Sequence, residues 1–245
     1  MLIVGNTKAF IRSKKEAETL IRLYGTLQKS SRHSLVLALP HPFLLLKKGE
    51  TLRFASQNVS EFPDGAHTGE VVASVLKDAG AQYSIAGHSE RRAKGETNDV
   101  VREKVTQLLA KNIIPILCIG ESERSDDGEY LDVILEQISS AFTGRTIKEM
   151  SSMVVAYEPV WAIGKETAPT PELIYETVLY IRKIINRIEP LAAKKVRVIY
   201  GGSVDSTDVK MLAQDAGVDG FLLGRASANP EEMKLLMSIL NEVRR

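Results

Sequence analysis

The sequence predicts an α/β protein that forms one (β/α)8 barrel of eight parallel strands, a single domain spanning residues 1–245. Eight short, almost continuously apolar runs alternate with longer amphipathic segments, as expected for parallel strands that are buried on both faces. No linker rich in Pro, Gly or Ser and no block of like charge interrupts this alternation. Barrels of about 200–250 residues commonly fold as one domain.

The eight apolar runs are the expected strands. Their starts lie between 18 and 43 residues apart, which leaves room for a helical crossover in nearly every interval. An open, doubly wound sheet is the alternative architecture, but no dinucleotide-binding glycine pattern follows the first run. The runs are Leu2–Val4, Ser34–Leu39, Leu52–Ser56, Tyr83–Ala86, Ile113–Ile119, Met153–Ala156, Val196–Tyr200 and Gly220–Leu223.

The segments between the runs carry helix signals. Thr170 and Asn229 each precede a proline and an acidic residue, which is typical of a capping side chain at the start of a helix. Over Ile174–Ile188, apolar residues recur every three or four positions. Such a helix docks one face on the sheet and exposes the other.

Composition excludes several classes of function. The chain has 32 Lys and Arg against 31 Asp and Glu, so a broad basic surface for nucleic acid or anionic membrane is not expected. A single Cys cannot form an internal disulfide, which favours a reducing compartment. Residues 1–6 lack the basic region of a signal peptide, and the longest apolar runs are too short for a membrane span. We expect a cytoplasmic protein.

Polar residues and glycine turns follow several of the expected strands. In both architectures, functional groups gather at the carboxyl ends of the strands. The candidates are Asn6 and Lys8 after the first run, His88 after the fourth, Glu158 after the sixth, Gly201, Gly202 and Ser203 after the seventh, and Gly224 and Arg225 after the eighth.

Each candidate also has a purely structural interpretation. Lys8 would be a solvated loop lysine, His88 a cap of the following helix, Glu158 an exposed loop acid, and the glycine pair at 201–202 a simple turn. All of them, however, occupy the same relative position in a repeated unit. We therefore favour one shared site.

The residue types at this rim suit one kind of chemistry. Glycine-rich turns after the last two strands expose backbone N–H groups, and this part of a barrel frequently binds phosphate. A carboxylate, an imidazole and a lysine suit proton abstraction next to a carbonyl, with electrostatic stabilisation of the oxyanion. The sequence shows no metal-ligand spacing and no P-loop.

Several motifs resemble those of the triosephosphate isomerase family, whose fold is the (β/α)8 TIM barrel. They occur in the family's order over the whole chain. The matching segments are QN at 57–58, GAHTGE at 65–70, GHSERR at 87–92, LCIGE at 117–121, AYEPVWAIG at 156–164 and YGGSV at 200–204.

The resemblance implies interconversion of D-glyceraldehyde 3-phosphate and dihydroxyacetone phosphate in glycolysis and gluconeogenesis, without metal or organic cofactor. Glu158 would be the base that moves a proton between adjacent carbons. His88 would be a neutral electrophile, because the family keeps this imidazole uncharged by placing it at the N-terminus of a helix, which lowers its pKa. Lys8 and Asn6 would supply charge and a hydrogen bond to the enediolate.

Other segments match the family's binding elements. Backbone N–H groups around Gly164, Ser203, Gly224 and Arg225 would hold the phosphate, and residues 159–171 resemble a lid that excludes water. The loop 57–70, with Thr68, resembles the family's dimer loop, so a homodimer is expected. Cys118 corresponds to a buried thiol, and Glu90 and Arg91 to supporting charges.

Three departures from the family stand out. Thr7 lies between Asn6 and Lys8, where the family commonly has Trp. The segment 163–169 lacks the usual second lid glycine and the usual Lys-Thr-Ala hinge, and Arg225 replaces the second glycine after the last strand. We expect Arg225 to keep a negative φ, with its amide facing the phosphate and its side chain directed outward. None of the departures removes a proposed catalytic group.

Three hypotheses follow. The first is a triose phosphate isomerase. The second is an isomerase of another phosphorylated sugar, because a fold alone does not define a substrate. The third is a non-catalytic barrel that binds a phosphorylated metabolite, and the set of Lys8, His88 and Glu158 weighs against it.

Overall fold

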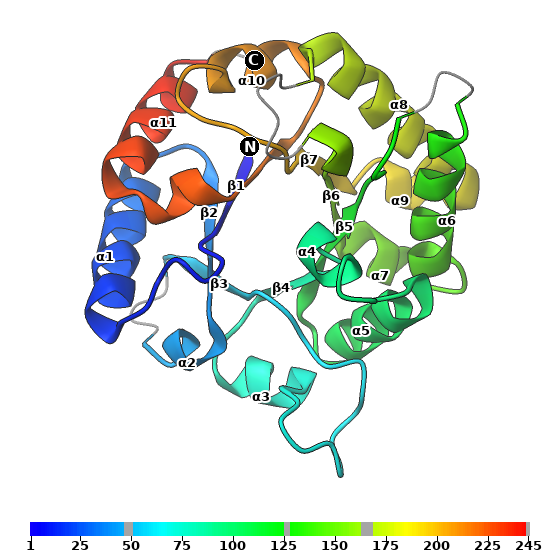
Figure 1. The fold of residues 1–245 in the computed structure, drawn as a ribbon, viewed down its shortest axis with the longest axis horizontal. Helices are drawn as coiled ribbons and strands as arrows, with labels where there is room; N and C mark the ends of the chain where they lie inside the picture. Colours follow the sequence, from blue (N-terminus) through cyan, green and yellow to red (C-terminus); the bar gives the residue numbers. More distant parts are fainter. Residues whose placement is uncertain (47–50, 125–127, 163–168, 244–245) are drawn as a thin grey trace.

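The computed structural model describes residues 1–46, 51–124, 128–162 and 169–243, and it confirms the barrel. All eight strands pair in parallel in sequence order, and β8 pairs with β1, so the open sheet is excluded. Figure 1 shows the strands at the centre of a ring of helices. The strands are β1 (Leu2–Asn6), β2 (Ser34–Leu39), β3 (Arg53–Ser56), β4 (Tyr83–Ala86), β5 (Ile114–Ile119), β6 (Val154–Tyr157), β7 (Arg197–Tyr200) and β8 (Gly220–Leu223).

The helices fill the intervals between the strands. The expected caps are confirmed: the Thr170 side chain accepts from the Leu173 N–H, and Asn229 accepts from the Glu231 and Glu232 N–H groups. The helices are α1 (Lys14–Ser30), α2 (His41–Leu44), α3 (Ala73–Asp78), α4 (Ser89–Arg92), α5 (Asn98–Ala110), α6 (Tyr130–Phe142), α7 (Ile147–Ser152), η1 (Val160–Ala162), α8 (Pro171–Ile188), α9 (Pro190–Ala193), α10 (Val209–Asp215), η2 (Arg225–Ala228) and α11 (Pro230–Glu242).

The strands are buried on both faces, which explains why their sequences are almost continuously apolar. One cluster of side chains fills the barrel interior and includes Val4, Val36, Ile116 and Ile199. A larger cluster lies between the strands and the surrounding helices. Because both layers are closely packed, the strand ends hold the rim at fixed positions.

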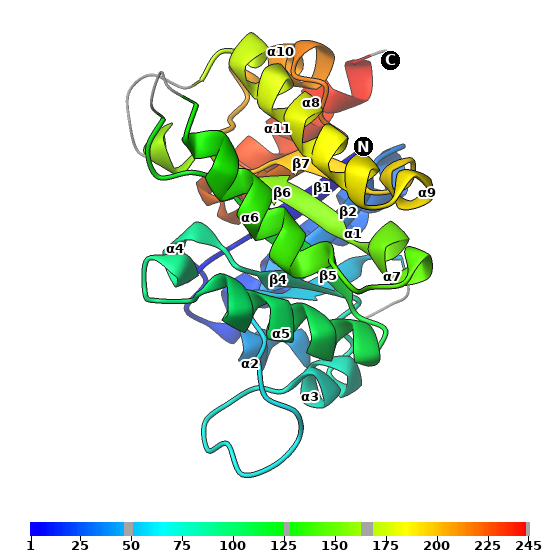
Figure 2. The ribbon, with the colours of Figure 1, turned by 90° about the vertical axis from the view of Figure 1, so that its right-hand side faces the viewer.

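The connection between β3 and α3 departs from this compact outline. It projects from the ring of helices as a long loop (Figures 1 and 2). Within it, the rings of Phe62 and His67 stack with their centroids 4.2 Å apart, and Phe62 is 40% exposed. An exposed aromatic on a projecting loop suits contact with another protein surface.

No helix within the described parts of the chain combines the length and the apolar character that a membrane crossing requires.

Candidate active site

A cavity of about 800 Å³ brings the predicted residues together at the carboxyl ends of the strands. Glu158, His88, Lys8, Asn6, Ser203, Gly224 and Arg225 all line it. Gly164, also predicted at the site, lies outside the described residues, as does the rest of segment 163–168 of the predicted lid. Phe10, for which the sequence predicts no role, also lines the cavity and is 48% exposed.

Glu158 lies at the centre of the polar contacts, directly after β6. It is only 2% exposed, so its interpretation as an exposed loop acid is wrong. One carboxylate oxygen, Oε1, lies 3.2 Å from His88 Nε2, and Oε2 accepts from the Ser89 N–H at 2.9 Å. A buried carboxylate with both oxygens engaged has a well-defined position, as a base in a proton transfer needs.

His88 follows β4 and has two roles at once. Its Nδ1 accepts from the Glu90 N–H at 3.1 Å, so it caps α4. Because Nδ1 is an acceptor, this hydrogen-bond pattern assigns the ring proton to Nε2, which faces Glu158. The capping interpretation is therefore right, and it also gives the imidazole the tautomer that presents an N–H donor to the cavity.

Gly201 makes room for this arrangement. A Cβ atom at position 201 would lie 2.9 Å from Glu158 Cγ, closer than real side-chain contacts allow. The Gly201 N–H donates to the Tyr157 carbonyl at 2.8 Å, which holds the turn against the end of β6. The sequence predicted a phosphate-binding turn here; its first glycine also accommodates the Glu158 side chain.

Lys8 reaches the site on a strained backbone. Its φ is +47°, a conformation that residues other than glycine rarely adopt and that often marks functional positions. Lys8 Nζ pairs with Glu90 Oε1 at 2.7 Å, and the Lys8 side chain is 28% exposed, so it is not a freely solvated lysine. Burial alone would raise the pKa of Glu90, but the hydrogen bond and charge of Lys8 outweigh it and lower that pKa.

Thr7, which replaces the tryptophan common in the family, is hydrogen-bonded within the loop that follows β1. Thr7 is fully buried, and its hydroxyl donates to the Ala38 carbonyl at 3.0 Å. Gln57 Nε2 donates to Thr7 Oγ1 and to the Lys8 carbonyl, at 3.1 and 3.0 Å. These bonds hold the loop that carries Asn6 and Lys8. Sequence reasoning gave Gln57 no such role, since 50 residues separate it from Thr7.

Arg225, in the turn after β8, keeps a negative φ. Among the described non-glycine residues, only Lys8 and Asn112 have positive φ, so the expected negative φ of Arg225 is confirmed. Its side chain is exposed at the cavity and makes no ion pair with another described residue. Whether its amide faces phosphate stays a prediction.

A buried acid holds the start of the connection after β6. Glu121 Oε1 accepts from Tyr157 Oη at 2.9 Å and from Trp161 Nε1 at 2.7 Å. Arg124 lies 3.7 Å from the same oxygen and stacks over the Tyr130 ring at 4.5 Å. Burial raises the pKa of Glu121 above its usual value. Sequence reasoning recognised Glu121 only as part of a motif.

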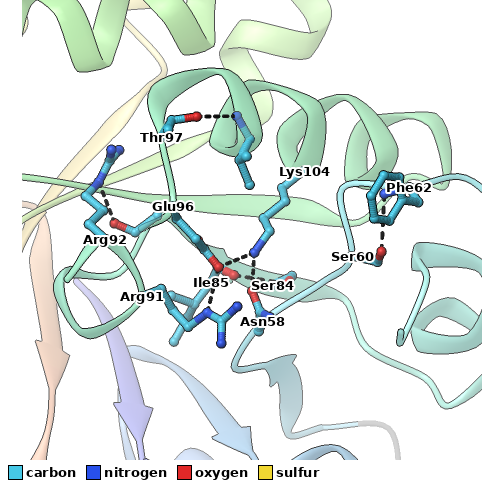
Figure 3. A network of polar contacts seen from close by, with 12 residues as sticks. Asn58, Ser60, Phe62, Ser84, Ile85, Arg91, Arg92, Glu96, Thr97 and Lys104 are labelled. Atoms are coloured by element: carbon cyan, nitrogen blue, oxygen red, sulfur yellow. Dashed lines mark hydrogen bonds and ion pairs between the residues drawn. The ribbon is translucent and has the colours of Figure 1, made fainter. Parts of the chain in front are cut away.

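A second charged network supports α4 from behind the site. Figure 3 shows Arg91 and Lys104 converging on Glu96. Lys104 is 1% exposed, and its Nζ also donates to Asn58 Oδ1 at 2.8 Å. Asn58 belongs to the base of the projecting loop, so this network ties that loop to the helix that follows His88. Arg91 is thus a supporting charge, as predicted.

Cys118 is fully buried in β5, which confirms the prediction of a buried thiol. Burial raises the pKa of this thiol well above its usual value, and the nearby Glu158 carboxylate adds to the effect. Among the residues whose positions are described, no group of three or more His, Cys, Asp or Glu side chains is arranged to hold a metal ion.

Known proteins are similar to this chain over most of its length. The family model described as Triosephosphate isomerase matches residues 1–242. A triosephosphate isomerase of Shewanella piezotolerans is 34% identical, with 97% of this chain and 96% of the relative covered. The triosephosphate isomerases of Endomicrobium trichonymphae and Shewanella amazonensis are each 38% identical over 78% of this chain. The matched regions cover 77% of the first relative and 74% of the second. The chain therefore belongs to the triosephosphate isomerase family.

Proposed function

We propose that this protein is an isomerase that interconverts D-glyceraldehyde 3-phosphate and dihydroxyacetone phosphate, in glycolysis and gluconeogenesis. The observation that carries the proposal is the contact of Glu158 Oε1 with His88 Nε2, at 3.2 Å, on the wall of a cavity that Lys8 also lines. A protein that only binds a phosphorylated metabolite has no need of a base paired with an imidazole donor.

The geometry suits a proton transfer between neighbouring carbons. Glu158 removes a proton from the carbon next to the carbonyl, and the electron pair moves onto the carbonyl oxygen to give an enediolate. The Nε2–H of His88 polarises that oxygen and moves the hydroxyl proton between the two oxygens. Lys8 and Asn6 stabilise the negative charge, and Glu158 returns its proton to the other carbon.

The glycine turns suit the phosphate group. Backbone N–H groups of Ser203, Gly224 and Arg225 would hold it, together with that of Gly164. These donors belong to parts of the rim that do not carry out the proton transfer. Phosphate binding and proton transfer are therefore separable by mutation.

A coupled isomerase assay in excess chelator tests the proposal, with a panel of other phosphorylated sugars in parallel. Rapid turnover of the triose phosphates, with slower turnover of longer sugar phosphates, is the expected result. Preference for another sugar phosphate would support the second hypothesis. Binding without turnover of any of them would support a non-catalytic barrel.

The proposal includes a homodimer in the cytoplasm. Phe62, which is exposed and stacks on His67 in the projecting loop, supports contact with a second copy, and Thr68 follows His67 in the same loop. A single, buried thiol at Cys118 suits a reducing compartment. Light scattering at micromolar concentration should give twice the chain mass of 27.0 kDa. A monomer mass with full activity would contradict the dimer.

A further inference from the structure

A tyrosine on the outer layer of the barrel reaches the turn that follows β8. Tyr24, on α1, is fully buried, and its hydroxyl donates to the Ser227 carbonyl at 3.1 Å. The two residues are 203 positions apart in the sequence. Burial raises the pKa of the Tyr24 hydroxyl far above its usual value, so the group remains a hydrogen-bond donor at neutral pH.

Gly5 leaves the space that this tyrosine occupies. A Cβ atom at position 5 would lie 2.2 Å from the Tyr24 hydroxyl oxygen and 2.8 Å from Cζ. The phenol therefore lies directly against the backbone of β1, one residue before Asn6. Any side chain at position 5 would displace the phenol, so the contact depends on this glycine.

Ser227 is in turn hydrogen-bonded to Gly224. The Ser227 N–H and hydroxyl both donate to the Gly224 carbonyl, at 3.0 and 2.7 Å. A Cβ atom at Gly224 would lie 3.9 Å from Lys8 Nζ, so the ammonium group of Lys8 lies over the same turn. A hydrogen-bonded path thus runs from α1 through Ser227 to the first residue of the turn.

We propose that Tyr24 is a positioning residue for phosphate: its hydroxyl holds the turn 224–228 so that the Gly224 and Arg225 N–H groups point at the phosphate of the substrate. The inference rests on the proposed function, which assigns phosphate to this turn. Tyr24 never touches the substrate. It acts by fixing the backbone of η2, a turn of only four residues between β8 and α11.

The variant Tyr24→Phe removes the hydroxyl and keeps the ring. A neutral hydrogen bond of this kind is expected to raise KM for D-glyceraldehyde 3-phosphate about three- to tenfold. The kcat should change less than about twofold, because phosphate contacts present in both the ground state and the transition state affect KM alone. The dissociation constant of inorganic phosphate, measured by calorimetry, should rise by the same factor as KM. Turnover of phosphate-free D-glyceraldehyde should not change.

Tyr83→Phe is the matched control. Tyr83 is also buried, and its hydroxyl accepts from Arg53 Nη1 at 3.2 Å at the start of β4, remote from the phosphate turn. Both variants remove one buried hydroxyl, so both should melt at a somewhat lower temperature. Only Tyr24→Phe should weaken phosphate binding.

Ser227→Ala provides a second route if Tyr24→Phe folds poorly. It removes the hydroxyl bond to Gly224 and should also weaken phosphate binding, less than additively with Tyr24→Phe because both act on one turn. Unchanged phosphate binding in both variants, or a loss in kcat alone, would overturn the inference. If the parent protein binds phosphate but isomerises no triose phosphate, the proposed function fails instead.

Discussion

Shortening Glu158 by one methylene, in Glu158→Asp, tests the proposed proton transfer most directly. The variant keeps the carboxylate and withdraws it by about 1.5 Å, the length of one C–C bond. Glu158 now reaches both His88 Nε2, at 3.2 Å, and the Ser89 N–H, at 2.9 Å. Aspartate at this position cannot hold both contacts from an unchanged backbone.

The size of the effect follows from this geometry. A displacement of about 1 Å at a reacting group can lower the rate about 10²-fold, so we expect kcat to fall about 10²-fold in Glu158→Asp. Glu158→Gln removes the base altogether, and a general base contributes about 10²–10⁴-fold. The amide variant should therefore be slower than the aspartate variant. KM should change little in either, because the proposed phosphate donors belong to other turns.

A coupled assay with D-glyceraldehyde 3-phosphate in excess chelator measures both constants, and Glu176→Gln on the exposed surface of α8 serves as the control. A Glu158→Gln variant that retains more than a tenth of the parent kcat would contradict the role of Glu158 as the base. An aspartate variant slower than the amide variant would contradict it as well. Activity lost with chelator and restored by a divalent metal would contradict the cofactor-free mechanism.

Four further outcomes are expected. Lys104→Met should lower the free energy of unfolding, measured by urea denaturation, by about 1.5–3 kcal/mol, because it leaves the half-buried Glu96 with one cation fewer, whereas Lys94→Met on the surface should change it little. Burial alone would raise the pKa of Glu96, but Lys104 and Arg91 outweigh burial and lower that pKa. The ionised Glu96 therefore stabilises the fold at pH values above its pKa in the unfolded chain, and this stability is lost as the pH falls through its lower pKa in the folded protein. Glu96→Gln should therefore flatten the acid side of the stability profile below about pH 5, and an equally steep profile would contradict this. Phe62→Asp should shift light-scattering masses toward the monomer, and an unchanged dimer would exclude Phe62 from the interface. Arg225→Gly should change KM less than about tenfold, equivalent to about 1.4 kcal/mol, and a much larger loss that weakens with added salt would show that the guanidinium binds phosphate directly.

The strands and the rim of the site could be predicted from local sequence. Each expected strand agrees with the structure to within two residues at either end, because strands buried on both faces need uninterrupted apolar residues. Lys8, His88 and Glu158 follow three of these strands and all line one cavity. Parallel strands of a closed barrel present their carboxyl ends on one side, so position in the repeat was sufficient to group them.

The supporting contacts could not be predicted in this way. The bonds from Gln57 to Thr7, from Tyr24 to Ser227 and from Lys104 to Asn58 join residues 46 to 203 positions apart. No period or local pattern marks such pairs. Each depends on which side chains of neighbouring elements meet once the barrel has closed.

The barrel, the family and the residues on the rim could thus be predicted from short segments of the chain, because apolar periodicity and motifs are properties of such segments. The orientation of the rim residues depends instead on contacts between distant segments. Glu158 is held by Ser89 and given room by Gly201, and Lys8 takes a positive φ beside Glu90. The orientation of each side chain depends on contacts shorter than about 3.5 Å with atoms of other segments, and these contacts form only when all eight strands have closed around one core.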